Sequence, residues 1–377
     1  METNSKIVIV GAGLAGLTAA IHLSKLGYSI ILIEKNSFPK HKVCGEYISN
    51  EVLPYLDWLD VNPEILKPTK IDSLLFSTAK GKTIKAKLPL GGFGISRYAF
   101  DFYLFEKAKA QNYEIIQETV TDIHFSDDLF TVHLSNNTTL IADIVIGAYG
   151  KRSNIDQKLQ RNFIQKKSPW LAVKAHYKGE FPNNLVGLHN FKGGYCGVSK
   201  VENDVINICY LADYETFQQY KNIEEYQSKV VAKNPLLQSI FDQTTPIFEK
   251  PLTISQICFD KKEPVDQHIL MIGDSAGLIH PLCGNGMAMA IRSAKIVSEL
   301  VDGYCQNNIH SRKELEQKYK QTWHENFKSR LQIGSILGSI LQHQNLSEWL
   351  IRIFIQFPIL LSEVIKRTHG KEIQIKP

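Results

Sequence analysis

The chain has 377 residues, of which 44% are hydrophobic and 21% charged, a composition typical of globular rather than disordered proteins. A formal net charge of +5 is small for this length and argues against a nucleic-acid partner, but it is compatible with anionic cofactors or a membrane surface. The six cysteines are scattered without a C-x-x-C pair, and the first residues lack a secretory pattern, so we expect reduced thiols in a cytoplasmic protein.

The first stretch that carries chemistry spans residues 6–35. An apolar, β-branched strand pattern leads into three glycines at G-x-G-x-x-G spacing: Gly11, Gly13 and Gly16. In this arrangement the first glycine permits a tight turn, the second lets the backbone approach a pyrophosphate, and the third lets helix and strand pack closely. A helix and a second strand follow, and the strand ends on Glu34, where a carboxylate accepts hydrogen bonds from a ribose diol. The order of these features predicts a dinucleotide-binding unit.

The next segments are less specific. Residues 36–61 hold a basic loop and a Cys44-Gly45-Glu46 turn before a short helical pattern, and Gly45 would allow a ligand to approach the backbone. An ordinary surface loop explains these residues equally well. Alternation over 71–90 predicts a hairpin, and a helix then starts at Arg97. The guanidinium could reach a phosphate, or it could be a solvated surface arginine.

Strand patterns dominate the middle of the chain. Three short strands are predicted over 118–125, 130–134 and 139–146, and the last runs into a glycine-rich, basic turn suited to an anion. From residue 168 to 260, four alternating segments predict an antiparallel sheet with a covering helix over 215–234 and a further strand near 253–259. Such a sheet would roof a cofactor cleft.

The second diagnostic stretch spans residues 268–301. It begins with a buried strand that ends on Gly273-Asp274, and this aspartate can accept hydrogen bonds from a polyol chain. A turn shaped by one proline and two glycines follows: Pro281, Gly284 and Gly286. The amphipathic helix after that turn presents free N–H groups and its positive dipole end to an electron-rich ring.

Together, the glycine turn with Glu34, Arg97-x-x-Phe-Asp and the Gly273-Asp274 stretch resemble the successive FAD motifs of flavoprotein monooxygenases. Within that superfamily, the Lys-Val-Cys-Gly-Glu run at 42–46 resembles the geranylgeranyl-reductase-like branch. The resemblance implies an α/β fold: a Rossmann-type FAD-binding domain with a parallel sheet and a three-stranded β-meander, an inserted antiparallel substrate-binding sheet and a helical C-terminal tail. The expected FAD-binding domain comprises 1–70, 95–165 and 262–310, the substrate-binding domain 71–94 and 166–261, and the C-terminal helical region 311–377.

The resemblance also implies which residues face the cofactor, FAD, and the substrate. The expected FAD contacts are Gly11, Gly13, Leu14, Ala15, Gly16, Glu34, Lys35, Cys44, Gly45, Arg97, Gly273, Asp274, Gly284, Asn285, Gly286 and Met287. Candidates near the reactive ring are His280, Cys44 and Cys283, and candidates near the substrate are Tyr195 and Pro281. No metal site is expected.

The activity implied first is a monooxygenase that hydroxylates an apolar or phenolic small molecule through a flavin hydroperoxide. The alternatives are a geranylgeranyl-reductase-like enzyme that reduces C=C bonds of a prenyl or lipid substrate, and a flavin-binding electron-transfer protein. With one dinucleotide fingerprint, NAD(P)H would bind transiently or a separate reductase would supply electrons. The chain departs from family patterns at Tyr149-Gly150, which replaces Asp-Gly, and at 195–200, which keeps the Tyr of Tyr-x-Trp-x-Phe-Pro alone. It lacks the Trp-x-Trp-x-x-Pro of halogenases, so halogenation is disfavoured.

The C-terminal run from Trp349 to Ile365 is apolar but is interrupted by Arg352, Gln356 and Pro358, so it is too short and too polar to span a bilayer. It either packs on the core as a helix or forms an apolar lid that contacts a membrane surface. In the second case the nearby cations would favour anionic headgroups: Lys366, Arg367 and Lys371.

Overall fold

The computed structural model describes residues 5–111, 113–220 and 222–375. Its first layer is a six-stranded sheet in the order β17-β18-β10-β1-β2-β6, parallel except for the β17–β18 pair. The strands are β1 (Ile7–Val10), β2 (Ile30–Ile33), β6 (Glu114–Ile116), β10 (Ile144–Gly147), β17 (Val265–Asp266) and β18 (Ile269–Met271). Because β1 is central and fully buried, the glycine turn that follows it opens at the carboxyl edge of the sheet, where ligands bind in such folds.

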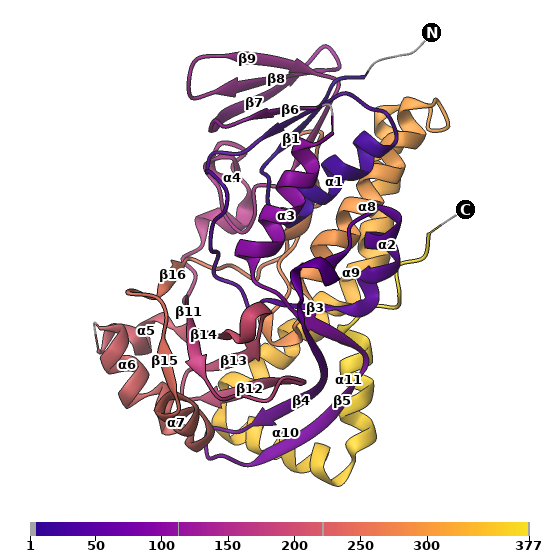
Figure 1. Cartoon of the computed structure of the whole chain (residues 1–377). Helices are drawn as coiled ribbons and strands as arrows, with labels where there is room; N and C mark the ends of the chain where they lie inside the picture. The colour runs from indigo at the N-terminus through magenta and orange to yellow at the C-terminus, as the bar shows by residue number, and fades with distance from the viewer. Residues whose placement is uncertain (1–4, 112, 221, 376–377) are drawn as a thin grey trace.

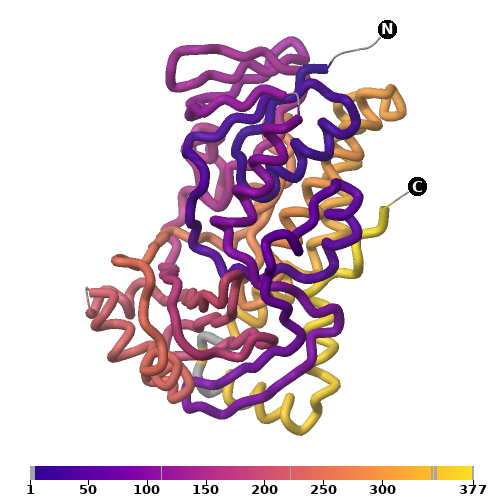
Figure 2. Tube along the Cα trace, in the orientation of Figure 1, coloured from indigo at the N-terminus to yellow at the C-terminus, as the bar shows by residue number. Residues whose placement is uncertain are grey.

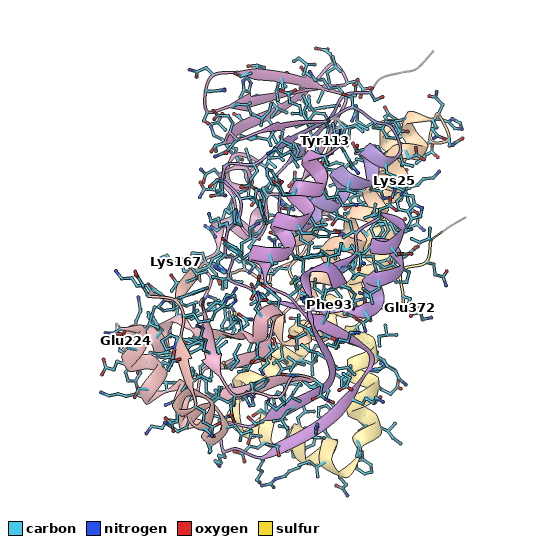
Figure 3. The ribbon with its side chains drawn as sticks, in the orientation of Figure 1. Lys25, Phe93, Tyr113, Lys167, Glu224 and Glu372 are labelled. Carbon is cyan, nitrogen blue, oxygen red and sulfur yellow. The ribbon has the colours of Figure 1, made fainter. Side chains whose placement is uncertain are left out.

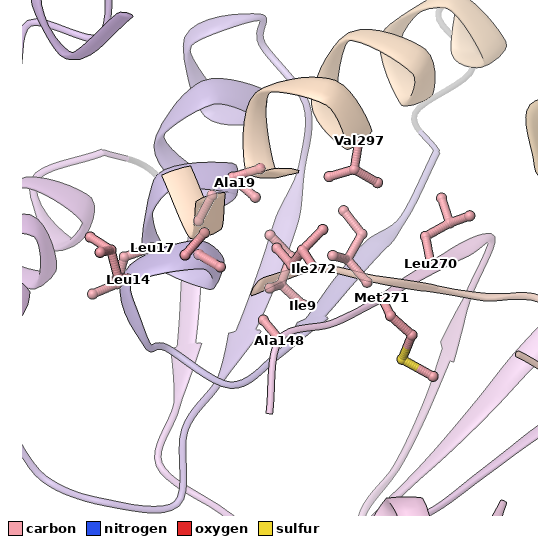
Figure 4. Close-up of a cluster of buried hydrophobic side chains, with 14 of the residues drawn as sticks. Ile9, Leu14, Leu17, Ala19, Ala148, Leu270, Met271, Ile272 and Val297 are labelled. Carbon is pink, nitrogen blue, oxygen red and sulfur yellow. The ribbon is translucent and has the colours of Figure 1, made fainter. Parts of the chain in front are cut away.

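Helices cover this sheet and form the main core with it. They are α1 (Leu14–Lys25), α2 (Leu53–Trp58), α3 (Arg97–Lys109) and α8 (Gly286–Cys305). Side chains of α1, α8 and the strands meet in one buried cluster, which includes Leu17, Ile272 and Val297 (Figure 4). This packing fixes the N-termini of α1 and α8 at the same edge of the sheet, as the predicted α/β fold requires.

The predicted meander is present as β7 (Val120–Ser126), β8 (Leu129–Leu134) and β9 (Thr139–Ala142). The predicted third strand over 139–146 is wrong, however, because it is two strands in two sheets. Asp143 separates them: its backbone N–H donates to the Lys6 carbonyl at 3.0 Å, and its carboxylate accepts from the Lys6 N–H at 2.7 Å. This exchange directs β10 away from the meander and into register with β1. A short helix, α4 (Asn154–Lys158), follows.

The second layer is a mostly antiparallel sheet in the order β15-β11-β14-β13-β12-β4-β5-β3, with β16 paired to β11. Its strands are β3 (Tyr47–Ser49), β4 (Thr69–Ser77), β5 (Thr83–Gly94), β11 (Trp170–Gly179), β12 (Leu185–Phe191), β13 (Gly194–Lys200), β14 (Ile206–Asp213), β15 (Thr244–Pro246) and β16 (Leu252–Ser255). The buried ring of Phe93, labelled near the centre of Figure 3, joins the end of β5 to the core of the parallel sheet. The predicted hairpin and the predicted inserted strands thus share one sheet, while the domain boundaries themselves stay a prediction.

The single helix predicted over 215–234 is wrong. The segment instead forms α5 (Tyr214–Gln218) and α6 (Ile223–Lys229), and α7 (Pro235–Asp242) comes next. Asparagines restart the helices: Asn222 accepts a hydrogen bond from the Glu224 N–H at 2.8 Å, and Asn234 accepts one from the Leu236 N–H at 2.9 Å. The strand predicted near 253–259 also ends early, at Ser255.

The C-terminal region forms α9 (Arg312–Gln342), α10 (Gln344–Gln356) and α11 (Pro358–Thr368), and the last two pack beside β5 at the lower end of the molecule (Figures 1 and 2). The apolar run predicted from the sequence is divided at Pro358, which cannot donate a helical hydrogen bond. The buried Glu51 carboxylate holds the region in place, because it pairs with Arg330 at 3.2 Å and accepts the Gly370 N–H. Among the described residues, no helix combines the length and apolar character that crossing a membrane requires.

Candidate active site

A cavity of about 760 Å³ extends from the glycine turn after β1 to the space between the second sheet and the C-terminal helices. Its lining changes in character along its length. Backbone, carboxylates and cations line the end near β1, and mainly apolar side chains, together with Thr368 and His369, line the end near α10 and α11. One space therefore combines a polar half and an apolar half.

The three glycines of the turn have different surroundings. A Cβ on Gly16 would lie 1.9 Å from the Gly11 carbonyl oxygen, and Gly11 itself adopts a φ of +102°, so both positions require glycine for backbone reasons. A Cβ on Gly13 would instead enter open space, with Lys42 Nζ at 3.7 Å and Arg97 Nη2 at 3.9 Å as its nearest neighbours. The free N–H groups at the start of α1 and these two cations converge on a cradle suited to a pyrophosphate.

Arg97 is not a solvated surface residue, since its side chain is only 14% exposed. Its Nε and Nη2 atoms donate to the two Asp101 carboxylate oxygens at 2.6 and 2.7 Å, and Lys42 Nζ lies 2.9 Å from the same carboxylate. Burial alone would lower the pKa of Arg97, but the Asp101 carboxylate more than offsets this effect and raises it. Asp101 therefore fixes two charged donors beside Gly13 and leaves further N–H groups of each free to bind an anion.

Glu34 follows β2, and hydrogen bonds fix the position of its carboxylate. Its Oε2 accepts from the Ala12 N–H and its Oε1 accepts from the Asn36 N–H, both at 3.0 Å. Oε1 also accepts from Asn36 Nδ2 at 2.6 Å, and both Glu34 and Lys35 line the cavity. This geometry suits a ribose diol.

The other sequence-predicted site residues divide into two groups. Those that line the cavity are Gly11, Gly13, Leu14, Ala15, Glu34, Lys35, Cys44, Gly45, Arg97, Tyr195, Gly273, Asp274, Pro281, Cys283, Gly284, Gly286 and Met287. Three do not line it: Gly16, His280 and Asn285. Gly16 packs on Gly11, and Asn285 is directed into the buried Glu51–Arg330 cluster, where its side chain bonds to both partners.

His280 is packed in the wall behind the cavity. Its ring lies 4.9 Å from that of Phe259, 5.8 Å from Tyr195 and 6.3 Å from Trp170. Burial lowers the pKa of His280 from 6.5 to about 4, so the imidazole is neutral at physiological pH. Burial likewise raises the pKa of Cys283 to about 12, which makes this thiol a wall group rather than a thiolate nucleophile.

The buried histidines should make the folded protein less stable at acidic pH. Burial lowers the pKa of His22 to about 3 and those of His189 and His280 to about 4. In the unfolded chain these groups bind protons near pH 6.5, so the folded state loses stability as pH falls from 6.5 toward 4. We expect replacing His280 with phenylalanine to shrink the loss of unfolding free energy between pH 7 and 5 by about 2 kcal/mol. Urea unfolding at the two pH values measures this, and exposed His310→Gln is the control that should leave the loss unchanged.

Sequence reasoning missed a buried ion cluster formed by Glu46, Lys174 and His176. Glu46 Oε1 lies 2.5 Å from Lys174 Nζ, and its Oε2 lies 2.7 Å from His176 Nε2. Glu46 also accepts the Arg97 N–H at 2.8 Å, which links the cluster to the cation pair. Burial would raise the pKa of Glu46, but the hydrogen bonds and charges of His176 and Lys174 lower it. The one sequence signal was the i, i+2 spacing of Lys174 and His176, which places both on one face of β11.

The apolar half of the cavity is walled by the second sheet and by the C-terminal helices. The second sheet and the segments beside it contribute Leu74, Phe76, Ile84, Leu88, Ala172, Val186, Leu188, Leu211, Ile254 and Ile257. The C-terminal helices contribute Leu337, Leu350, Ile351, Phe354, Leu361, Val364 and Ile365. We call this half the aliphatic chamber. Cys44 and Met287, whose sulfur atoms are 3.4 Å apart, belong to the same continuous lining.

The profile of the FAD binding domain family matches residues 4–301. The chain belongs to this family. It is 25% identical over 342 residues to digeranylgeranylglycerophospholipid reductase of Methanococcus aeolicus, a match that covers 87% of this chain and 84% of that protein. It is 23% identical to FAD-dependent monooxygenase atnA of Arthrinium sp. over 87% of this chain but 49% of that protein. Among solved structures it resembles CmlS, a flavin-dependent halogenase, with a TM-score of 0.75 and 21% identity over 88% of this chain and 64% of that one.

The chain is thus an FAD-binding oxidoreductase, and the predicted cofactor and superfamily are confirmed. The open cradle at Gly13 fits the FAD pyrophosphate, because a bare backbone, two cations and a helix N-terminus face it. Glu34 fits the adenosine ribose. Asp274 and the N-terminus of α8 line the part of the same cavity that leads to the aliphatic chamber.

Proposed function

We propose that this FAD-binding oxidoreductase reduces isolated carbon–carbon double bonds of a prenyl-type lipid whose chain occupies the aliphatic chamber. The observation that carries the proposal is the continuity of this chamber with the cofactor half of the cavity. The sequence alone placed oxygenation first. Aliphatic walls favour an isoprenoid chain over a phenol, since a buried phenolic hydroxyl needs a hydrogen-bond partner. The relatives named digeranylgeranylglycerophospholipid reductase also support placing reduction before oxygenation, because the chain covers 84% and 89% of the length of two of them.

The walls of the chamber give the substrate its binding energy. Each apolar group that leaves water gains roughly 25 cal/mol per Å² of buried surface. The charged side chains of the lining belong to the segments around the cofactor half, among them Lys42, Arg97 and Asp274. A charged headgroup would therefore be placed outside the chamber while the chain fills it.

Reduction of a double bond adds a hydride to one carbon and a proton to the other. FAD, once reduced, supplies the hydride. We assign the proton to Tyr195, because this residue lines the cavity and a phenolic hydroxyl is protonated at neutral pH. NAD(P)H, bound transiently, or a separate reductase would restore the reduced cofactor.

An anaerobic single-turnover experiment tests the proposal. Photoreduced protein is mixed with a geranylgeranyl ether lipid under argon, and flavin absorbance and product mass are followed. We expect the oxidised flavin spectrum to return without oxygen and the lipid to gain two hydrogen atoms. Tyr195→Phe should slow this return by about a hundredfold, a typical contribution of one positioned acid, and should leave FAD retention unchanged.

Oxygenation of an apolar substrate is the second candidate, favoured by residues 195–200, which lack the Trp and Phe-Pro of the reductase pattern. In this case the flavin would reoxidise only when oxygen is admitted, and the product would gain an oxygen atom. Reoxidation by oxygen without a changed lipid would instead indicate an electron-transfer protein. Either result would overturn the reductase proposal.

A further inference from the structure

The junction of α10 and α11 exposes an unusual run of apolar side chains. Phe357 is 53% exposed, Ile359 77% and Leu360 46%, with exposed Pro358 between them. On the outer face of α10, Trp349 is 62% exposed and Ile355 51%. We call Trp349, Ile355, Phe357, Ile359 and Leu360 the elbow. Consecutive exposed apolar residues of this size commonly mark a binding surface.

Core packing does not explain the elbow, because the same two helices already use a different face for that purpose. Ile351, Phe354, Leu361 and Ile365 are buried, and all four line the aliphatic chamber. The elbow residues of the same two helices and their junction are exposed instead. The two helices are therefore apolar both toward the chamber and toward the outside.

Basic side chains accompany the elbow. Arg352 is exposed on the same face of α10 as Trp349, and Lys366 and Arg367 are exposed in the last turn of α11. Two acidic residues are near: Glu363 pairs with Lys366 at 2.8 Å, and Glu348 pairs with Lys80 of the β4–β5 turn at 3.3 Å. The cations exceed these acids, which complements an anionic surface.

The elbow also stands where a flat surface can reach it. In Figure 1, α10 and α11 form the lower end of the molecule, and the β7–β9 meander forms the opposite end. Neither helix is long enough to cross a bilayer, so an apolar edge with flanking cations suits the interface between headgroups and acyl chains.

We propose that the elbow docks this protein on an anionic phospholipid bilayer, with Trp349, Phe357 and Ile359 in the interface and Arg352 and Arg367 at the headgroups. The docking proposal rests only on the exposed apolar and basic side chains of this surface. That the docked helices also let a lipid chain pass from the bilayer into the chamber rests on the proposed function.

Co-sedimentation of the full-length protein with vesicles tests the docking. We expect binding to vesicles of phosphatidylcholine with phosphatidylglycerol. Ile359→Asp should weaken the partition coefficient at least about tenfold, because one large apolar side chain leaves the interface and a like charge enters it. The matched control is Ile141→Asp on β9, which alters a side chain that is 47% exposed at the other end of the molecule and should change nothing.

The charges are tested separately. The double variant Arg352→Gln with Arg367→Gln should bind the anionic vesicles more weakly, by roughly fivefold for each charge removed. This difference from the unaltered protein should disappear in high salt. Lys313→Gln with Lys320→Gln, exposed on the first turns of α9, is the control. Equal binding by Ile359→Asp and Ile141→Asp would overturn the proposal. So would absent vesicle binding together with a concentration-dependent dimer that Ile359→Asp abolishes, because the elbow would then bind a second copy of the chain.

The two proposals fail in different ways. Vesicle binding with the expected variant effects, but no anaerobic reduction of the lipid, would contradict the proposed reaction and leave the docking in place. Anaerobic reduction of detergent-dispersed lipid without vesicle binding would contradict the docking alone.

Discussion

Gly13→Asp should give a folded protein that does not retain FAD. The position has room for a side chain, since the nearest atoms to a Cβ there are the Lys42 and Arg97 nitrogens at 3.7 and 3.9 Å. A carboxylate would pair with these cations and would stand where the pyrophosphate binds. Two like charges about 4 Å apart repel by about 4 kcal/mol at the dielectric of a protein surface, so we expect FAD affinity to fall roughly a thousandfold. Flavin absorbance after gel filtration and titration with FAD measure this loss.

Two neighbouring substitutions serve as controls. Gly13→Ala should keep the fold and weaken FAD binding only modestly, because a methyl group fits the open space without adding charge. Gly16→Ala should instead lower the melting temperature of the apoprotein, since its Cβ would meet the Gly11 carbonyl oxygen at 1.9 Å. The assignment of Gly13 to the pyrophosphate would be wrong if Gly13→Asp bound FAD as the unaltered protein does.

The features that the sequence predicted well are those set by local chemistry. The glycine spacing at Gly11 and Gly16 reports a turn that any other residue would disrupt, and the strand patterns along residues 170–213 correspond to real strands, although β11 and β14 are buried on both faces rather than on one. Most of the residues assigned to FAD line the cavity for the same reason, because the motif itself places them at the carboxyl edge of the sheet.

The features that the sequence did not predict depend on contacts between distant segments. The division of the strand over 139–146 follows from the pairing of Asp143 with Lys6, which no local pattern records. Glu46, Lys174 and His176 come from a loop and a strand more than a hundred residues apart. The chamber likewise forms only when α10 and α11 close against the second sheet, so its size could not be read from either segment alone.

The contacts of Glu46 also link the aliphatic chamber to the cofactor half of the cavity. Glu46 contacts the Arg97 backbone on one side and two side chains of β11 on the other. A single carboxylate therefore connects the cation pair that faces the pyrophosphate cradle with the sheet that walls the chamber. Loss of the Glu46 carboxylate should therefore affect both the cation pair and the second sheet.

Replacing Glu46 with glutamine should lower the free energy of unfolding by about 3–5 kcal/mol, because it leaves the fully buried Lys174 ammonium without its counter-ion. The pKa of Glu46 is lowered in the fold from 4.5, so its contribution to stability is complete above pH 4.5 and is lost as pH falls through the folded pKa. Urea unfolding at pH 7 measures the difference in unfolding free energy between the variant and the unaltered protein. This difference should shrink at pH values below the folded pKa of Glu46. Exposed Glu64→Gln, which alters a surface pair with Lys70, should change stability by less than about 0.5 kcal/mol.

A second substitution separates the charge effect from other damage. Lys174→Met added to Glu46→Gln should recover much of the lost stability, since replacing a buried ion pair with apolar groups is often neutral whereas removing one partner is not. Both the single and the double variant should bind FAD somewhat more weakly, because a neutral amide oxygen at position 46 accepts the Arg97 N–H less strongly than the carboxylate does. Unchanged stability of Glu46→Gln at pH 7 would show that the cluster contributes little. A double variant as unstable as the single one would show that the loss arises from packing rather than from an unpaired charge.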